Sequence, residues 1–367
     1  MTVHIVLMFT IIILGMVTYS TFPVTKAVNK RFIIVSMFLI FLVEALRAPS
    51  VGRDTYVYAR SFELIARPGF NWRTSSWEKF YIFLNMIVAK FTDNPQIFLA
   101  VVSAIILTGI GVFIYKSMDH SYSAFWPVFF FMSFTHYLNS MNLLRQYLAM
   151  AFVLQIYWVL RDVEGIKKYI TSIILLFTGM MFHSTAIVGI LFAVPYLWKT
   201  IKRKTIVFIG MVGIVLIAGI STILPYVFML FPQYTKYIGT MRMAGETGGL
   251  GVYYLVYVAL KLMFIVLAFM LSPDVENNKE IYRLTFISII AAGLILMKTK
   301  VSIAHRTGYY FDIFFILFIP EVVNRIKNDK FWIYLLLFAY AMFCFFATLD
   351  SPDRACVPYL FFWEYQY

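Results

Sequence analysis

The amino-acid sequence predicts an all-α, polytopic integral membrane protein with about 12 transmembrane helices. Three observations support this fold class. Hydrophobic residues make up 62% of the 367 residues and charged residues only 13%, whereas soluble domains carry about 25% charged residues. The mean hydropathy is +0.81. Long apolar runs recur along the whole chain and are separated by short polar segments.

The apolar runs define the expected helices. A helix that crosses the hydrocarbon core needs about 20 residues, and shorter runs are tolerated where protein surrounds them. A further apolar segment at 77–91 is expected to lie as an amphipathic helix at the outer interface instead of spanning. The runs expected to span lie at 3–22, 32–48, 96–116, 124–139, 142–160, 169–182, 184–198, 205–223, 252–271, 284–297, 308–320 and 331–348.

The first run is expected to remain as a transmembrane helix. A signal peptide carries its basic residues before the apolar segment and a small-residue cleavage site after it. Here no Lys or Arg precedes the run, and Lys26, Lys30 and Arg31 follow it. The N-terminus is therefore expected to lie outside.

Basic residues set the predicted orientation, because short cytoplasmic loops carry an excess of Lys and Arg. If 77–91 does not span, 16 of the chain's 31 Lys and Arg fall on one side, in the loops at 23–31, 116–123, 161–168, 199–204, 272–283 and 321–330. This side is predicted to be cytoplasmic, so topology explains most of the net charge of +13 without a nucleic-acid partner. A single transmembrane domain, 1–367, then has outer segments at 48–95, 224–251, 298–307 and 349–367.

Arginine predominates over lysine in the segments predicted to face outward, whereas the cytoplasmic loops carry mostly lysine. Topology does not require outward arginine. The planar guanidinium group matches phosphate oxygens two at a time. Ordinary interfacial arginine is the alternative for each residue taken singly, but the set indicates a site for an anionic headgroup.

The first candidate cluster follows the second span, in EALRAPSVGRDTYVY. It holds Glu44, Arg47, Arg53 and Asp54, and Gly52 lets the chain turn there. Asp54 beside an arginine can orient a substrate or accept a proton. An ion-paired loop carboxylate is the structural alternative.

The second cluster is NLLRQ, with Asn142, Arg145 and Gln146. Asn142 and Arg145 are three residues apart and share a helix face. They begin a span from the outside, where the positive end of the helix dipole favours an anion. A snorkelling arginine is the alternative.

The third cluster is FHST, where His183 lies in a short outward turn between two spans. Histidine titrates near neutral pH and is the usual general base, although a lone histidine is more often structural. The fourth cluster, KTKVSIAHRTGYYFD, includes Arg306 and Tyr310 at the entry to a span. An aromatic belt with a basic flank is its alternative.

Lys261 lies in the middle of a predicted span. A charge there is costly and usually faces the bundle interior, so Lys261 is expected to line a cavity or to pair with a carboxylate that the sequence does not identify. Cys344 and Cys356 form no disulfide framework and are expected to be free thiols.

The sequence contains no Walker A, CxxC, HExxH or DxD-type motif. This argues against an ATP-driven pump, a zinc enzyme and a metal-dependent nucleotide-sugar transferase, so no metal or other cofactor is expected. An outward site has no access to nucleotide sugars. A lipid-linked donor has an anionic diphosphate and an apolar tail, which suits interfacial arginines beside apolar helices.

These clusters resemble those of the EpsG-like family of polysaccharide polymerases, which are relatives of the Wzy O-antigen polymerases. The first loop departs from the family pattern, in which glycine often directly precedes the aspartate, because Arg53 stands between Gly52 and Asp54. The resembling motifs occur in order as RDTYVY, the WE pair ending at Glu78, NLLRQ, FHS, HRTGYYF followed by Pro320, and VPY at 357–359.

The resemblance implies a GT-C-like fold and a glycosyltransferase for exopolysaccharide, capsule or O-antigen synthesis. Such an enzyme moves a growing glycan from undecaprenyl diphosphate onto a lipid-linked oligosaccharide repeat unit, at the outer face of the cytoplasmic (inner) membrane. Its partners would be these donor and acceptor lipids and the membrane lipids, with a chain-length regulator protein as a further candidate.

As a hypothesis, Arg145, Arg306, Arg53 and Arg47 bind the diphosphate. His183 and Asp54 are both candidates for the base that takes the acceptor proton. Asn142, Gln146, Tyr310 and Glu78 would contact the sugars. The competing functions are a lipid-linked oligosaccharide flippase or other transporter, an O-antigen ligase and an acyltransferase.

Overall fold

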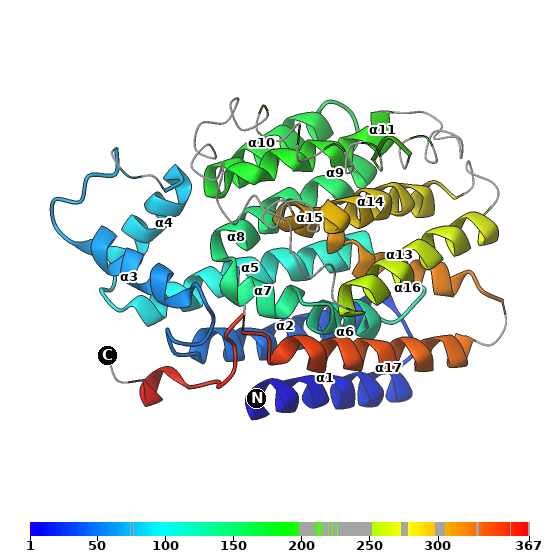
Figure 1. Ribbon diagram of the computed structural model, residues 1–367, viewed down its shortest axis with the longest axis horizontal. Helices are drawn as coiled ribbons and strands as arrows, with labels where there is room; N and C mark the ends of the chain where they lie inside the picture. Colours follow the sequence, from blue (N-terminus) through cyan, green and yellow to red (C-terminus); the bar gives the residue numbers. More distant parts are fainter. Residues whose placement is uncertain are drawn as a thin grey trace. The chain divides into compact units, whose positions relative to one another are not determined.

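The computed structural model forms two compact units of helices, Met1–Ala193 with Phe331–Tyr367 (unit 1) and Val194–Lys330 (unit 2). Each unit is described by itself (Figure 1). The structure describes residues 1–197 except 74 and 76, scattered positions from 208 to 226, and 252–272, 278–297, 305–327, 330–352 and 354–365. Apart from those scattered positions, the predicted span at 205–223 and the outer segment at 224–251 lie outside them, as do residues 298–304 of the fourth cluster.

The helices of unit 1 follow most of the predicted apolar runs. Two helix starts have clear local causes: the Thr25 side chain accepts a hydrogen bond from the Val28 N–H, and Asn94 accepts one from Gln96 ahead of Pro95. The helices are α1 Thr2–Thr21, α2 Lys26–Leu46, α3 Thr55–Ala66, α4 Lys79–Ala89, α5 Pro95–Ser117, α6 Phe125–Ser133, α7 His136–Asn142, α8 Leu144–Val153, α9 Gln155–Asp162, α10 Lys167–Phe182, η1 Ser184–Ala193, α17 Lys330–Leu349 and η4 Phe362–Glu364.

Helix α5 lies at the centre of unit 1 and packs against α2 and α8 (Figure 1). Its side chains Phe98, Val102 and Ile106 are fully buried. At Gly109 a Cβ atom would lie 2.5 Å from the Ala151 Cβ. The absence of a side chain there lets α5 and α8 approach closely.

Both the length and the apolar composition of a membrane span are found in α1, α5 and α17 among the described residues. The pair formed by α7 and the α8–α9 segment is bent by 118° and adds a fourth candidate. The chain is therefore an all-helical membrane protein in its described part, while the dozen spans and the GT-C-like arrangement stay predictions.

Four predicted runs differ from the observed helices. The run at 142–160 is divided between α8 and α9, and the run at 308–320 is divided into two helices, His305–Asp312 and Phe315–Asn324. The run at 124–139 is not one helix, because α6 ends at Ser133 and Thr135 adopts a φ of 77°, which an α-helix cannot accommodate. The run at 184–198 forms a 3-10 helix followed by a short α-helix. The segment at 77–91 forms α4, which has 11 residues and is about 16 Å long, too short to span.

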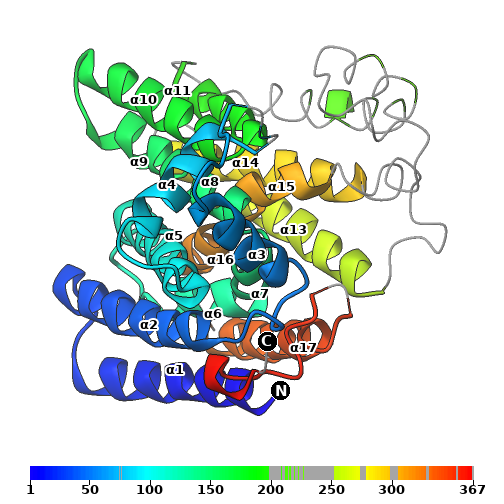
Figure 2. The ribbon, with the colours of Figure 1, turned by 90° about the vertical axis from the view of Figure 1, so that its left-hand side faces the viewer.

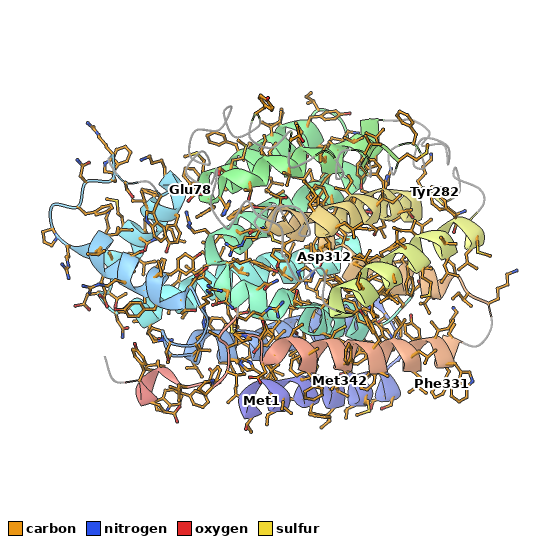
Figure 3. All side chains as sticks on the ribbon, viewed as in Figure 1. Met1, Glu78, Tyr282, Asp312, Phe331 and Met342 are labelled. Carbon is orange, nitrogen blue, oxygen red and sulfur yellow. The ribbon has the colours of Figure 1, made fainter. Side chains whose placement is uncertain are left out.

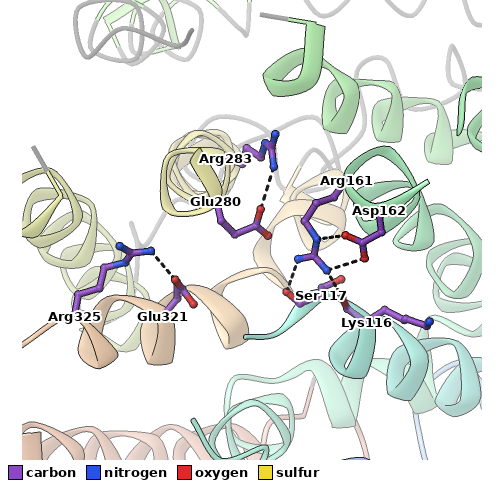
Figure 4. A network of polar contacts seen from close by, with 8 residues as sticks. All are labelled: Lys116, Ser117, Arg161, Asp162, Glu280, Arg283, Glu321 and Arg325. Carbon is purple, nitrogen blue, oxygen red and sulfur yellow. Dashed lines mark hydrogen bonds and ion pairs between the residues drawn. The ribbon is translucent and has the colours of Figure 1, made fainter. Parts of the chain in front are cut away.

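The loops of unit 1 that were predicted to share one side do lie together. Asn29 donates to the Tyr122 carbonyl at 3.0 Å. Arg161 donates to the Ser117 carbonyl at 3.1 Å and to that of Lys116 (Figure 4). Helix α5 runs from this end of unit 1 to the opposite end. Its 23 residues are about 34 Å long, which is comparable to the thickness of a hydrocarbon core.

Unit 2 contains α11 Val194–Leu197, α13 Val252–Leu271, α14 Lys279–Leu296, α15 His305–Asp312 and α16 Phe315–Asn324 among its described residues. Two of its three predicted basic loops, 272–283 and 321–330, also lie together, and the third, 199–204, is outside the described residues. Arg325 donates to Asn278 and so joins the two loops. Figure 4 shows the ion pairs of Arg325 with Glu321, at 2.8 Å, and of Arg283 with Glu280, at 3.2 Å.

Candidate functional site

The candidate site in unit 1 surrounds the break between α7 and α8, where NLLRQ lies. The loop after α2 packs onto this break. Arg47 donates to the Met141 carbonyl at 3.3 Å and to the Glu44 carbonyl, and the Thr55 hydroxyl donates to the same Met141 carbonyl at 3.3 Å. The helix break leaves carbonyl groups without helical partners, and these two side chains satisfy one of them.

Arg47 is fully buried in this arrangement, and so is Glu44. Ser140 donates to the Glu44 carboxylate at 2.7 Å. A buried guanidinium group needs such partners, because an unpaired charge in the interior is costly. The structure therefore places Arg47 in the scaffold beneath the loop, and its role as a diphosphate ligand stays a prediction.

Gly52 makes the turn that the sequence predicted, with a φ of +99°. A Cβ atom there would lie 2.5 Å from the Thr55 hydroxyl oxygen and 3.2 Å from the Asn142 amide oxygen. Arg53, which is exposed, and Asp54, which is partly exposed, follow this turn. Asp54 begins α3, but its side chain makes no capping hydrogen bond to that helix.

The C-terminal tail pairs with the same loop (Figure 2). The N–H groups of Ala48, Gly52 and Arg53 donate to the carbonyls of Leu360, Ala355 and Arg354 at 2.9, 2.8 and 3.0 Å. The sequence placed the tail on the outer side but did not predict this pairing. The VPY motif at 357–359 lies inside the paired segment, but in the sequence it supported only the family resemblance.

Cys356 attaches the tail to buried residues of α1 and α7. Its carbonyl accepts a hydrogen bond from His4 in α1 at 3.0 Å, and its Sγ accepts one from Asn142 at 3.4 Å. The thiol is free and fully buried, as is Cys344, so both predicted free thiols are confirmed. Burial raises the pKa of the Cys356 thiol to about 11.

Arg145 lies in the first turn of α8 and forms an ion pair with Glu78, just before α4. Figure 3 labels Glu78 at this position. The guanidinium carbon lies 4.5 Å from the centroid of the Trp77 ring, and Trp77 stacks on Tyr81 at 5.1 Å. The Arg145 side chain is 28% exposed. A positive group at a helix N-terminus, supported by an aromatic face, is thus directed to a partly open position.

Asn142 and Gln146 lie on either side of Arg145 in the sequence and are almost fully buried. Asn142 also donates to the Leu138 carbonyl at 2.9 Å. Their predicted contacts with sugars stay predictions. His136 is fully buried, with Nδ1 at 3.0 Å from the Tyr147 hydroxyl.

His183 ends α10 and is partly exposed. Its Nδ1 accepts a hydrogen bond from the Thr185 N–H at 3.3 Å and lies 2.9 Å from the Thr185 hydroxyl. The preceding Phe182 contacts Phe80 at 5.9 Å and stacks on Phe152 at 5.5 Å. The contact with Phe80 brings the FHST turn against the start of α4, next to Glu78. Phe152 lies in the last turn of α8, the helix that carries Arg145 in its first turn.

The fourth predicted cluster lies in unit 2. Arg306 is exposed in the first turn of α15, and Tyr310 is fully buried on the same helix. The side chain of His305 is outside the described residues. The first three clusters therefore meet in unit 1, and the fourth is described only within unit 2.

Lys261 pairs with a carboxylate that the sequence did not identify. This partner is Asp312 at the end of α15, labelled in Figure 3. Lys261 Nζ lies 2.7 Å from Asp312 Oδ1, and the Tyr257 hydroxyl donates to Asp312 Oδ2 at 3.1 Å. The ammonium group also lies 3.6 Å from the centroid of the Phe315 ring. The choice that the sequence left open is thus settled in favour of an ion pair. Among the described residues, no group of three or more His, Cys, Asp or Glu is placed to hold a metal ion.

Comparison with known proteins gave one family. The model of the EpsG family matches residues 30–366, which is nearly the whole chain. No curated protein and no solved structure showed a significant match.

Proposed function

Because the chain belongs to the EpsG family, and is thereby a polysaccharide polymerase-type membrane protein, we propose that it extends a glycan held on a lipid diphosphate. The donor is a growing glycan on undecaprenyl diphosphate, and the acceptor is a lipid-linked oligosaccharide repeat unit. The reaction takes place at the outer face of the cytoplasmic membrane, at the end of unit 1 that carries Arg145.

The observation that carries this proposal is the setting of Arg145. Its guanidinium group lies at a helix N-terminus, is supported by the Trp77 ring and already holds one carboxylate, Glu78. A diphosphate is a stronger, multidentate acceptor for the same donors. Glu78 therefore occupies a position that a phosphate oxygen of the donor would take when it binds.

The chemistry follows from this placement. The acceptor hydroxyl oxygen forms a bond to the anomeric carbon of the donor sugar as the bond from that carbon to the diphosphate oxygen breaks. The electron pair leaves with the diphosphate, where Arg145 stabilises the developing charge. Arg53 assists, and the hydroxyl proton passes to a base, for which Asp54 and His183 are the candidates.

No specific observation favours transport over transfer. A transporter has charged groups within its spans, and Lys261 is a charged residue within a predicted span. Asp312 neutralises it inside unit 2, so this charge gives no support to a transport path. An O-antigen ligase would use the same donor chemistry, and the acceptor distinguishes the two reactions.

The test is a polymerisation assay with purified protein in nanodiscs and a repeat unit linked to undecaprenyl diphosphate, without added nucleotide. We expect a ladder of longer lipid-linked glycans. Arg145→Ala should reduce the rate about a hundredfold or more, as expected when a donor to a developing oxyanion is lost.

Arg67→Ala is the matched control, because Arg67 is an exposed arginine at the end of α3 that is not assigned to the site. It should give a wild-type ladder. An authentic repeat unit that yields no ladder with the wild-type protein would contradict the proposed polymerase. A normal ladder from Arg145→Ala would contradict the assignment of the anion site.

A further inference from the structure

We propose that His183 is a hydrogen-bond donor to the lipid diphosphate, through Nε2–H, and that it is not the base for the acceptor hydroxyl. This inference rests on the proposed function, which supplies the diphosphate. It chooses between the two base candidates on the hydrogen-bond geometry of one turn.

The geometry concerns His183 Nδ1. The backbone N–H of Thr185 donates to this nitrogen at 3.3 Å, and the Thr185 hydroxyl oxygen lies 2.9 Å from it. A backbone N–H can only donate, so Nδ1 must be the acceptor. A neutral imidazole has one N–H and one acceptor nitrogen, and its hydrogen is therefore on Nε2. The hydrogen bonds to Nδ1 therefore set the tautomer.

This tautomer decides the chemistry that the ring can perform. A general base needs an unprotonated nitrogen within reach of the hydroxyl proton. In His183 the unprotonated nitrogen is Nδ1, which already accepts a hydrogen bond from Thr185. The other nitrogen, Nε2, carries a hydrogen. Nε2–H is suited to donate to an oxyanion, and the same is true if the ring becomes protonated.

The place of His183 supports an anionic ligand. Phe182 lies in contact with Phe80 of α4 and Phe152 of α8. Phe80 is two residues from Glu78, so the turn lies beside the start of α4, where Glu78 pairs with Arg145. Phe152 fixes the turn against the last turn of α8. A second donor at this end of unit 1 would bind another oxygen of the diphosphate that Arg145 holds. Asp54 then remains as the candidate base.

The test uses two amides that each reproduce one ring nitrogen. The amide nitrogen of glutamine can take the position of Nε2 and donate, whereas that of asparagine corresponds to Nδ1. Neither is a base. We expect His183→Gln to rescue most of the activity lost in His183→Ala, while His183→Asn should remain as low as the alanine variant. The rescue should amount to about tenfold or more, since a charge-assisted hydrogen bond contributes about 1.5–3 kcal/mol.

A binding measurement gives a readout that does not depend on turnover. The Kd of undecaprenyl diphosphate in nanodiscs should rise about tenfold in His183→Ala and recover in His183→Gln. The activity of His183→Gln should keep the acid limb of the wild-type pH profile, because the base is another residue. Thermal unfolding of each variant verifies that it is folded.

The opposite result would be a His183→Gln variant as inactive as His183→Ala while undecaprenyl diphosphate binds normally to both. That outcome would make His183 the base and overturn the inference. A wild-type protein that gives no ladder would refute the polymerase itself, and the binding series would then still decide whether His183 is a donor to a diphosphate.

Discussion

Single residues decide two features of this molecule, a buried charge and a tight turn. The buried charge is Lys261, whose ion pair with Asp312 is almost completely removed from solvent. Such a pair contributes little net stability compared with apolar packing, but breaking it leaves one charge without compensation. The consequence can be measured with single and double substitutions.

Lys261→Met should lower the free energy of unfolding by about 3 kcal/mol or more, because it leaves the Asp312 carboxylate buried beside Tyr257 and Phe315. The double variant Lys261→Met with Asp312→Leu should recover most of this loss. Thermal unfolding in detergent, followed by tryptophan fluorescence, provides the measurement. Equal destabilisation by the single and double variants would show that the ion pair is not the cause.

The tight turn is at Gly52, and another glycine gives its control. Both Gly52 and Gly69 have positive φ values, +99° and +84°. Only at Gly52 does the added Cβ meet other atoms, those of Thr55 and Asn142, since none lie within 4 Å at Gly69.

Gly52→Ala should therefore destabilise the protein by more than Gly69→Ala, whose cost is backbone strain of about 1 kcal/mol. Gly52→Ala should also reduce polymerisation, because the displaced loop carries Asp54 and packs on Asn142. Thermal unfolding and the ladder assay measure the two effects. Similar values for the two variants would mean that the close approach of Gly52 to Asn142 is unimportant.

At the scale of elements, apolar runs predicted helix bounds well where a helix is continuous. The run at 96–116 is α5, 95–117, and the run at 331–348 is α17, 330–349. The break after α6 was not predicted, because the apolar pattern continues through Thr135, whose φ of 77° interrupts the helix. Likewise Arg145 and Glu78 were both singled out, but their pairing joins residues 67 positions apart, and a sequence pattern does not specify such a contact.

The sequence did not predict how the C-terminal tail packs. The reactivity of the buried Cys356 thiol can be used to test whether the tail is in place. The pKa of the buried thiol is raised to about 11, so at pH 8 roughly one thiol in a thousand is the reactive thiolate. Alkylation by iodoacetamide should be slow at pH 8 and should accelerate as the pH rises toward 11. The measurement is mass spectrometry of the peptide that contains Cys356.

Arg354→Ala should release the tail and increase the alkylation rate at pH 8 about tenfold or more. Arg354 donates to the Thr348 carbonyl at 3.1 Å and to Asn139 at 3.3 Å, and hydrogen bonds from a charged group contribute about 1.5–3 kcal/mol. Arg67→Ala should leave the rate at the wild-type value. If Arg354→Ala also leaves it unaltered, the tail is held by its backbone pairing with the loop at 48–53.

At the scale of the whole molecule, the sequence predicted which loops lie together. In unit 1 the loops that contain Asn29, Lys116 and Arg161 meet at one end. In unit 2 those that contain Asn278 and Arg325 also meet. The charge bias predicts this grouping because loops on one side of a membrane share the same excess of basic residues. The side that each group faces remains a prediction.

That orientation can be measured with two single cysteines in unit 1, Arg67→Cys and Glu164→Cys. Both positions are exposed and lie on opposite sides in the predicted topology. The native thiols are buried and should give little background. A membrane-impermeant maleimide applied to intact spheroplasts should label Arg67→Cys, and it should label Glu164→Cys only after lysis.

The reverse labelling pattern would place Arg145 and Glu78 on the cytoplasmic side. The site would then be exposed to nucleotide sugars. Its position would no longer favour a lipid-linked donor over them. The Arg145→Ala ladder assay would remain informative in that case, because guanidinium groups bind the diphosphate of a nucleotide sugar by the same contacts. Orientation and anion binding are therefore separate premises of the proposed reaction, and each has its own measurement.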